Sequence, residues 1–242
     1  MSQYDYSIQY RLFHDETQEY AEQAAEGLIG VLKPHVPSIT TTPILDIGCG
    51  YGFALLALKK LGFNNLLGLE ASSEQAERCE KGGFNVVVTN DTTDWLCRHR
   101  GEFGFVILLD VLEHVPVNHQ IDFLNAVYNV LAPGGKVLLT VPNANAILFG
   151  RWLYDDFTHN SSFTEHSLQF ALRNAGFESI NLESSKGLGR FPRRLWRRSA
   201  WPMVRKWIVR WCWLQVYKAE LPGSNLEEIS FELNLKAVAI KQ

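Results

Sequence analysis

Short apolar runs alternate with segments of helical periodicity through most of the chain. The runs are rich in Val, Ile and Leu and lie at residues 44–47, 66–70, 84–89, 105–109 and 136–141. Between and after them, apolar residues recur every three or four positions in segments 53–62, 72–81, 118–131 and 164–175. Strands that alternate with helices in this way predict a doubly wound, mostly parallel α/β sheet.

The two ends of the chain extend this pattern. Residues 19–32 carry apolar side chains on one helical face, which Pro34 ends, and they predict a helical cap before the sheet. Segments 177–184 and 229–240 predict strands six and seven. The connection between these strands is long for a compact domain and predicts a helical insertion. We expect one domain over residues 1–242, made of a cap at 1–40, a core at 41–184, the insertion at 185–228 and the last strand at 229–242.

The first apolar run leads into a glycine-rich turn. Gly48, Gly50 and Gly52 form this turn, Asp46 lies just before it, and a helical segment follows. Glycine allows positive φ and close approach of a ligand, and free N–H groups at a helix start favour electron-rich ligand groups. Glu70 ends the next strand, where a carboxylate can bind ribose hydroxyls. The spacing of the glycines differs from the Gly-x-Gly-x-x-Gly of dinucleotide sites.

This stretch resembles the first motif of class I S-adenosylmethionine (SAM) methyltransferases. Further matches are Asn90-Asp91-Thr92, Asp110-Val111-Leu112-Glu113-His114-Val115 and the turn Leu131-x-Pro133-Gly134-Gly135. The resemblance covers roughly residues 40–185. It implies a seven-stranded class I methyltransferase sheet, SAM as cofactor and S-adenosylhomocysteine as product.

The resemblance also implies a role for each matching position. The glycine turn backs the methionine part of SAM, and Asp46 helps to hold its amino-acid end. Glu70 binds the ribose, Asp91 accepts a hydrogen bond from the adenine amino group, and the backbone near Leu109 flanks the cofactor. For Asp91 an ordinary Asx turn is the alternative. The expected cofactor-binding residues are Asp46, Gly48, Cys49, Gly50, Gly52, Glu70, Asp91, Thr92 and Leu109.

An aromatic cluster precedes the cap helix. It consists of Tyr4, Tyr6, Tyr10 and Phe13. Packing against the sheet is one interpretation of this cluster. The other is a lid over the SAM site, which N-terminal segments often provide in the resembled family.

The link at residues 142–163 is expected to cover the acceptor, because loops above strand five do so in the resembled fold. Imidazole suits a base that acts on a hydroxyl near neutral pH. His159 is the first candidate base, with Asp156 beside it, and His114 is the second. A minority of the resembled family, including some ubiquinone-biosynthesis-type O-methyltransferases, binds a divalent metal at the positions of Glu113 and His114. We expect Glu113 and His114 to belong to a network at the helix start that holds the loop, and we expect no metal there.

The same link suggests an acceptor. The string Asp156-Phe157-Thr158-His159, followed by Phe163-Thr164 and by Ala175-Gly176-Phe177, is similar to methyltransferases encoded in surface-polysaccharide gene clusters. This resemblance implies O-methylation of a sugar hydroxyl on a surface polysaccharide or lipid-linked saccharide. Two alternatives stay open. One is O- or N-methylation of a soluble small molecule, such as a quinone-like ring or a secondary metabolite. The other is a SAM-binding protein without catalysis.

Charge is unevenly distributed along the chain. Residues 186–218 hold ten Lys and Arg, no Asp or Glu and five of the seven tryptophans, whereas the remainder holds 13 basic and 26 acidic residues. A basic helix with aromatic side chains predicts contact with an anionic membrane surface. An acceptor lid, a dimer contact and nucleic-acid binding are the alternatives, and the acidic remainder disfavours nucleic acid.

Cysteine usage and the N-terminal sequence bear on localisation. The four cysteines are scattered, and the first residues lack the apolar core of a signal peptide. We expect a cytoplasmic protein, at the inner face of the cytoplasmic membrane if the basic segment contacts lipid. The sequence does not indicate an oligomeric state.

Overall fold

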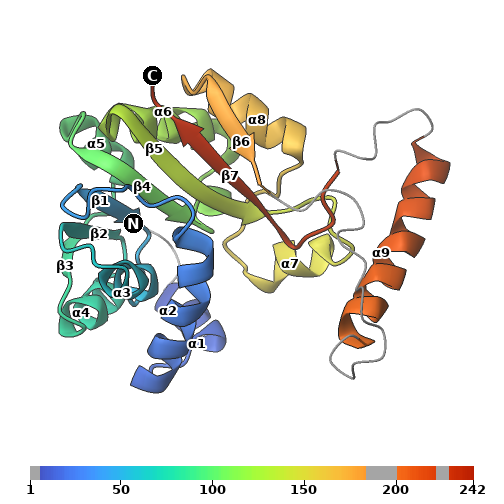
Figure 1. The fold of residues 1–242 in the computed structure, drawn as a ribbon, viewed down its shortest axis with the longest axis horizontal. Coiled ribbons are helices and arrows are strands. Elements are labelled where there is room, and N and C mark those ends of the chain that lie inside the picture. Colours follow the sequence, from blue (N-terminus) through green and yellow to red (C-terminus); the bar gives the residue numbers. More distant parts are fainter. Residues whose placement is uncertain (1–5, 184–200, 222–228) are drawn as a thin grey trace.

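One seven-stranded sheet forms the centre of the molecule (Figure 1). The structure is a computed structural model and describes residues 6–183, 201–221 and 229–242. The strand order is β3-β2-β1-β4-β5-β7-β6, with β1 to β5 parallel and β7 antiparallel to both β5 and β6. This confirms the predicted sheet. The strands are β1 Ile44–Ile47, β2 Leu66–Glu70, β3 Asn85–Val88, β4 Phe103–Leu109, β5 Leu131–Pro142, β6 Ser179–Leu182 and β7 Asn234–Ile240.

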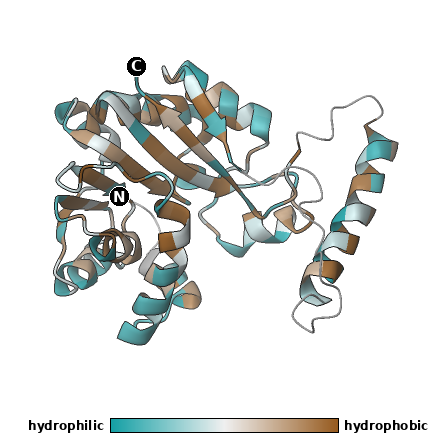
Figure 2. Ribbon diagram, in the orientation of Figure 1, coloured by the Kyte–Doolittle hydropathy of each residue, from teal (hydrophilic) through white to brown (hydrophobic). Residues whose placement is uncertain are grey.

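Helices cover both faces of the sheet, and alternate side chains of each strand reach opposite cores. In β4, Val106 and Leu108 pack with α5, α6 and α8, whereas Phe105 and Ile107 pack with α2, α3 and α4. Burial on both faces explains why β4 is apolar throughout, and Figure 2 shows the hydrophobic strands at the centre of the molecule. The helices are α2 Gln18–Leu32, α3 Phe53–Lys60, α4 Ser73–Lys81, α5 Thr92–Arg98, α6 Gln120–Val130 and α8 Glu165–Asn174, and two short 3-10 helices, η1 Leu112–His114 and η2 Val117–His119, follow β4.

The structure differs from the prediction in several element boundaries. Helix α5 was not predicted. The link after strand five, expected to be irregular, contains α7 (Phe149–Asp155). Strand β5 begins at Leu131 rather than Lys136, because the segment with Pro133-Gly134-Gly135 still pairs with β4 across a register shift. Strand β7 begins at Asn234, later than the expected residue 229.

Helices α1 (Tyr6–Phe13) and α2 form the predicted N-terminal cap. Helix α2 buries Ala25 and Leu32 in the core that it shares with α3. Helix α1 is tied to other elements by polar contacts: Arg11 pairs with Glu74 of α4, and Gln9 donates a hydrogen bond to the backbone of the last residue of α7 (3.1 Å). The cap therefore reaches from the helices beside the glycine turn to the link after β5.

Helix α9 (Trp201–Glu220) is the described part of the predicted insertion and lies at one end of the molecule, beyond α7 (Figure 1). Residues 184–200 and 222–228 of the insertion lie outside the described residues. Helix α9 contacts the core through Trp213 and Tyr217, which donate hydrogen bonds to the backbone and side chain of Asn145 (both 3.2 Å). Among the described helices, none is both long and apolar enough to cross a bilayer.

Candidate active site

The glycine turn after β1 has a backbone that requires glycine. Gly48, Gly50 and Gly52 have φ values of +71°, +53° and +82°. A Cβ at Gly48 would lie 2.7 Å from the Val111 side chain, so this turn packs closely on the segment after β4. Cys49 is buried, and its sulfur lies beneath the turn, 2.6 Å from where a Cβ on Gly68 would be. Only the backbone of Cys49 is therefore available to a ligand on the outer side.

Two buried carboxylates lie at this turn. Glu70 accepts hydrogen bonds from the backbone N–H groups of Gly50 (2.9 Å), Ala71 (2.8 Å) and Ser72 (2.9 Å), so it joins the turn to the end of β2. Burial raises the pKa of Glu70, and these three donors oppose the rise. Burial, with a smaller contribution from Glu70, raises the pKa of Asp46 to about 8. The pair therefore suits a ligand that brings a positive charge or hydroxyl donors.

Tyr10 of α1 lies directly over the turn. Its oxygen is 2.3 Å from where a Cβ on Gly50 would be, and it accepts a hydrogen bond from the Tyr51 backbone N–H. Its ring packs edge-on against Tyr51, with 4.7 Å between centroids. Burial raises the pKa of Tyr10, so the hydroxyl is neutral. Of the two interpretations of the aromatic cluster, this contact favours the lid. Tyr4 lies outside the described residues, and so does the side chain of Tyr6.

The turn after β3 has a local role in the structure. Asp91 is the N-cap of α5, and its Oδ1 accepts the Asp94 backbone N–H (2.9 Å), while Thr92 is the first residue of the helix. This is the Asx-type interaction that was the alternative for Asp91, and a role toward adenine stays a prediction. Val88 at the end of β3 pairs with Glu70, and therefore Asp91 lies on the same edge of the sheet.

A second polar group lies at the end of β4, beside Leu109. Asp110 has φ +53° although it is not glycine. Its Oδ1 accepts hydrogen bonds from the Thr140 hydroxyl (2.9 Å) and the Asn234 amide (2.7 Å), and the Trp152 indole donates to Asn234 (2.8 Å). A strained conformation held by neighbouring side chains is typical of functional sites. Asp110 was not among the predicted site residues, although it begins the matched string Asp110-Val111-Leu112-Glu113-His114-Val115 directly after a buried strand.

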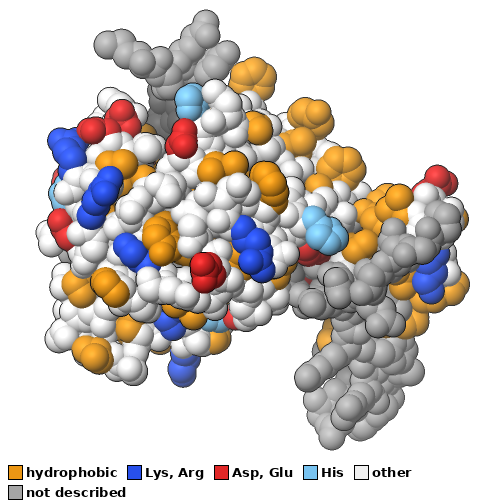
Figure 3. Space-filling model, turned by 90° about the horizontal axis from the view of Figure 1, so that it is seen from above, with side chains coloured by type: hydrophobic (Ala, Val, Ile, Leu, Met, Phe, Trp, Pro, Cys, Tyr) orange, Lys and Arg blue, Asp and Glu red, His pale blue; other side chains and the backbone are white. Residues whose placement is uncertain are grey.

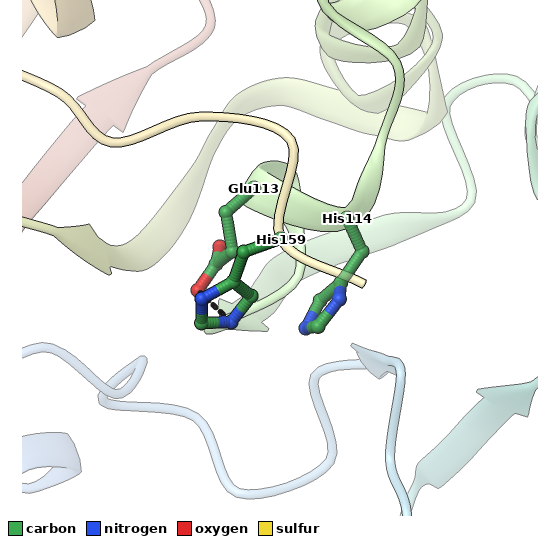
Figure 4. Close-up of side chains that lie close together, drawn as sticks. All are labelled: Glu113, His114 and His159. Atoms are coloured by element: carbon green, nitrogen blue, oxygen red, sulfur yellow. Dashed lines mark ion pairs between the residues drawn. The ribbon is translucent and has the colours of Figure 1, made fainter. Parts of the chain in front are cut away.

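Glu113, His114 and His159 come together after β4 (Figure 4). Asp110 is close enough to Glu113 for the two charges to interact. Glu113 is fully buried, and neither of its carboxylate oxygens has a hydrogen-bond partner among the described residues. Its Oε1 lies 3.9 Å from Nε2 of His159, and the rings of His114 and His159 are 4.8 Å apart. Burial, followed by the nearby charge of Asp110, raises the pKa of Glu113 to about 9.

A hydrogen-bonded chain fixes the tautomer of His114. The Thr158 hydroxyl donates to Asp156 Oδ1 (2.7 Å) and lies 2.8 Å from His114 Nδ1. Because an ionised carboxylate can only accept, Thr158 uses its proton on Asp156, and His114 Nδ1 must donate to Thr158. Burial, and then His159, lower the pKa of His114 to about 4, so its ring is neutral. Asp156, expected beside His159, is close enough to both histidines for their charges to lower its pKa, and Thr158 links its carboxylate to His114. Glu113 is a second carboxyl group that faces His159.

The fold matches that of known methyltransferases. The model of a family described as a methyltransferase domain matches residues 8–182. The chain belongs to this family. The match covers the cap, the glycine turn and the histidine cluster.

Solved structures share the fold of this methyltransferase domain. A SAM-dependent methyltransferase from Archaeoglobus fulgidus superposes with a TM-score of 0.65 at 19% identity, covering 90% of this chain and 94% of that one. Phosphoethanolamine N-methyltransferase 2 of Haemonchus contortus, in complex with S-adenosyl-L-methionine, superposes with a TM-score of 0.57 at 19% identity, covering 89% and 52%. The methyltransferase therefore has the class I fold of these structures.

Curated relatives have a higher sequence identity to this chain than the solved structures do, but the aligned segments cover less of each chain. The ubiquinone biosynthesis O-methyltransferase of Shewanella pealeana is 27% identical over 131 residues, which are 52% of this methyltransferase chain and 50% of the relative. That of Roseobacter denitrificans is 29% identical over 153 residues, which are 57% and 60%. The chain thus spans about half the length of the curated relatives it matches.

The methyltransferase site has two sides. The glycine turn, Asp46 and Glu70 form one side, called the cofactor side because the sequence predicts SAM there; their roles toward SAM stay predictions. Tyr10 covers the backbone of this turn, and its oxygen accepts the Tyr51 N–H. The histidines and Asp110 form the other side, called the acceptor side because the acceptor is expected there. Each of Glu113, His114 and His159 offers one ligand atom, and these atoms lie within 4.8 Å of one another, close enough to hold a divalent cation. The absence of a metal stays a prediction.

Proposed function

We propose that this chain is a SAM-dependent methyltransferase that transfers the methyl group to a hydroxyl. The observation that carries the proposal is the position of both sides of the site. The glycine turn follows β1, Glu70 ends β2, and the histidine–carboxylate cluster follows β4. All three are carboxyl ends of parallel strands, where ligands of such sheets bind.

SAM supplies an activated sulfonium methyl group when it is bound. The contribution of the chain is to position the acceptor for in-line attack and to take the proton that the hydroxyl releases. Aligning the two reactants is worth more than any single proton transfer, since orientation alone can supply several kcal/mol of the barrier.

His159 is the proposed base. Its Nε2 lies 3.9 Å from Glu113 Oε1, and the ring is close enough to Asp110 for that carboxylate to attract an imidazolium. His114 is the second candidate, but a pKa lowered to about 4 makes it a weak base near neutral pH. We propose that His114, with Thr158 and Asp156, orients the loop that carries His159.

For the acceptor, we propose a sugar hydroxyl of a surface polysaccharide or lipid-linked saccharide. The Asp110 carboxylate and the exposed Trp152 ring support this choice, because acidic hydrogen-bond acceptors beside an aromatic face suit a polyhydroxylated ring. A hydroxyl on a quinone-like ring is the second candidate, and the names of the curated relatives favour it. Both acceptors present a hydroxyl to the same base.

Formation of S-adenosylhomocysteine with an acceptor panel tests the proposal. The panel holds lipid-linked saccharides, soluble sugars and catechol-type phenols. Turnover with saccharides alone would support the first acceptor, and turnover with phenols alone would support the second. If SAM binds tightly and no acceptor in the panel is methylated, a binding protein becomes the better explanation. Mass spectrometry of glycans and lipids from a deletion strain, searching for the loss of one methylene mass, identifies the natural product.

A further inference from the structure

The outward side of α9 carries exposed apolar side chains. Trp201, Ile208 and Trp211 are 62%, 46% and 46% exposed, and Val216 is also exposed. At about 100° per residue these four side chains lie within about 140° of one another around the helix axis, so they form one side of the helix. Figure 3 shows hydrophobic side chains gathered at the end of the molecule where α9 lies. Exposed apolar side chains gathered on one side of a helix mark an interaction site.

The opposite side of α9 is the one that contacts the core. Arg210 is buried and faces Glu232 at 4.0 Å, and Trp213 and Tyr217 bond to Asn145. The Tyr217 ring packs edge-on against Phe231, with 5.4 Å between centroids. Contacts to the folded domain thus fix the orientation of the helix, and its apolar side is directed away from the core.

The charged residues of α9 indicate which kind of partner covers its apolar side. Arg205, Lys206 and Lys218 are exposed on the same helix, against one exposed acid, Glu220. A second copy of the chain docked here would bring two basic helices together, and like charges repel. An anionic lipid surface attracts the same three side chains, and indole rings favour the boundary between water and lipid. Basic residues in 186–200 add to the charge of the sequence but lie outside the described residues.

Further exposed apolar side chains lie on and beside α7, the helix before the loop that carries His159. They are Leu148, Phe149 and Tyr154, and Asn145, four residues before α7, accepts the two hydrogen bonds from α9. Tyr154 lies five residues before His159. A membrane that contacts α9 and α7 would therefore lie close to the loop that carries the proposed base.

We propose that α9 and α7 dock the protein on an anionic lipid surface, reversibly and without spanning it. In a cytoplasmic protein this surface is the inner face of the cytoplasmic membrane. The proposal is independent of the acceptor, since it concerns attachment and not turnover. It explains why tryptophan and basic residues concentrate in one helix that the core leaves half uncovered.

Vesicle flotation of the full chain tests this proposal. We expect the protein to float with vesicles of equal parts phosphatidylglycerol and phosphatidylcholine at low salt, to be released by high salt, and to float poorly with phosphatidylcholine alone. A basic residue near such a surface contributes about fivefold to binding, so R205Q/K206Q/K218Q should weaken the affinity about 100-fold. W201A/I208A/W211A should also weaken it, while circular dichroism and SAM binding stay unchanged, because these side chains are exposed.

The matched control is F170A/R173Q on α8, which removes an exposed aromatic and an exposed basic side chain elsewhere. It should float like the wild type. The proposal is overturned if the wild type floats with neither vesicle at low salt, or if the α9 variants float as well as the control. Sedimentation that shows a dimer dissociated by W201A/I208A/W211A would assign this surface to a second copy and also overturn it.

Discussion

The contact between Tyr10 and the glycine turn can be tested by placing a methyl group between them. In Gly50→Ala the new Cβ would lie 2.3 Å from the Tyr10 oxygen and 2.9 Å from the ring carbon that carries it. The φ of +53° adds about 1–2 kcal/mol of backbone strain for a non-glycine residue. Overpacking adds about 1–3 kcal/mol, because Tyr10 and α1 must move away. We expect a total loss of stability of about 2–5 kcal/mol.

Two comparisons separate these contributions. Gly83→Ala has a similar φ of +83° with nothing within 4 Å of the new Cβ, so it should show the strain alone. In a Tyr10→Ala background, Gly50→Ala should also cost the strain alone, which gives a coupling energy of about 1–3 kcal/mol. Urea denaturation of the four members of the cycle measures this, and thermal unfolding should follow at about 2–4 °C for each kcal/mol. If Gly50→Ala costs the same with and without Tyr10, then Tyr10 does not cover the turn.

Four further predictions concern the site. Replacing Glu70 with Ala should weaken SAM binding by about 1–3 kcal/mol in calorimetry, because the ribose hydroxyls lose an ionised acceptor, and an unchanged affinity would remove Glu70 from the site. His159→Ala should lower turnover by about 10²–10⁴-fold with SAM affinity nearly unchanged. A smaller effect than that of His114→Ala would move the base to His114. A chelator should leave turnover unchanged, and a loss that a divalent ion restores would assign a metal to the cluster. Glu113 has a folded-state pKa of about 9 against an ordinary 4.5, so its contribution to stability is full below about pH 4.5 and falls as the pH rises toward 9. Glu113→Gln should therefore show a smaller decline in stability between these limits by chemical denaturation, and an equal decline would refute the assigned pKa.

The fold could be predicted from sequence where burial leaves a periodic pattern. Strand β4 is apolar on both faces, and α6 has one apolar face, so both were recognised. Helix α7 buries none of its residues and has no such pattern. Strand β5 includes Pro133-Gly134-Gly135. These residues are typical of turns, so the sequence does not indicate that the segment pairs with β4.

The two sides of the site also differed in how far the sequence could predict them. The cofactor side is local, since Gly50 and Glu70 follow two adjacent strands and a motif records their spacing. The acceptor side brings together residues distant in sequence: Asn234 bonds to Asp110, and Glu113 faces His159. Proximity along the chain placed Asp156 beside His159. It could not indicate that Thr158 links this carboxylate to His114, because that contact joins segments distant in sequence.

The position of β7 has a consequence for synthesis on the ribosome. Strand β7 lies between β5 and β6, yet residues 183–233 separate it from β6 in sequence. While the nascent chain emerges, β5 has an open edge and β6 has no neighbour, and the apolar face of α9 leaves the exit tunnel before either strand is paired. Open strand edges and exposed apolar helices are the surfaces on which incomplete chains aggregate. The sheet is complete only after the last strand is made. We therefore expect a nascent chain that ends before β7 to depend on chaperones.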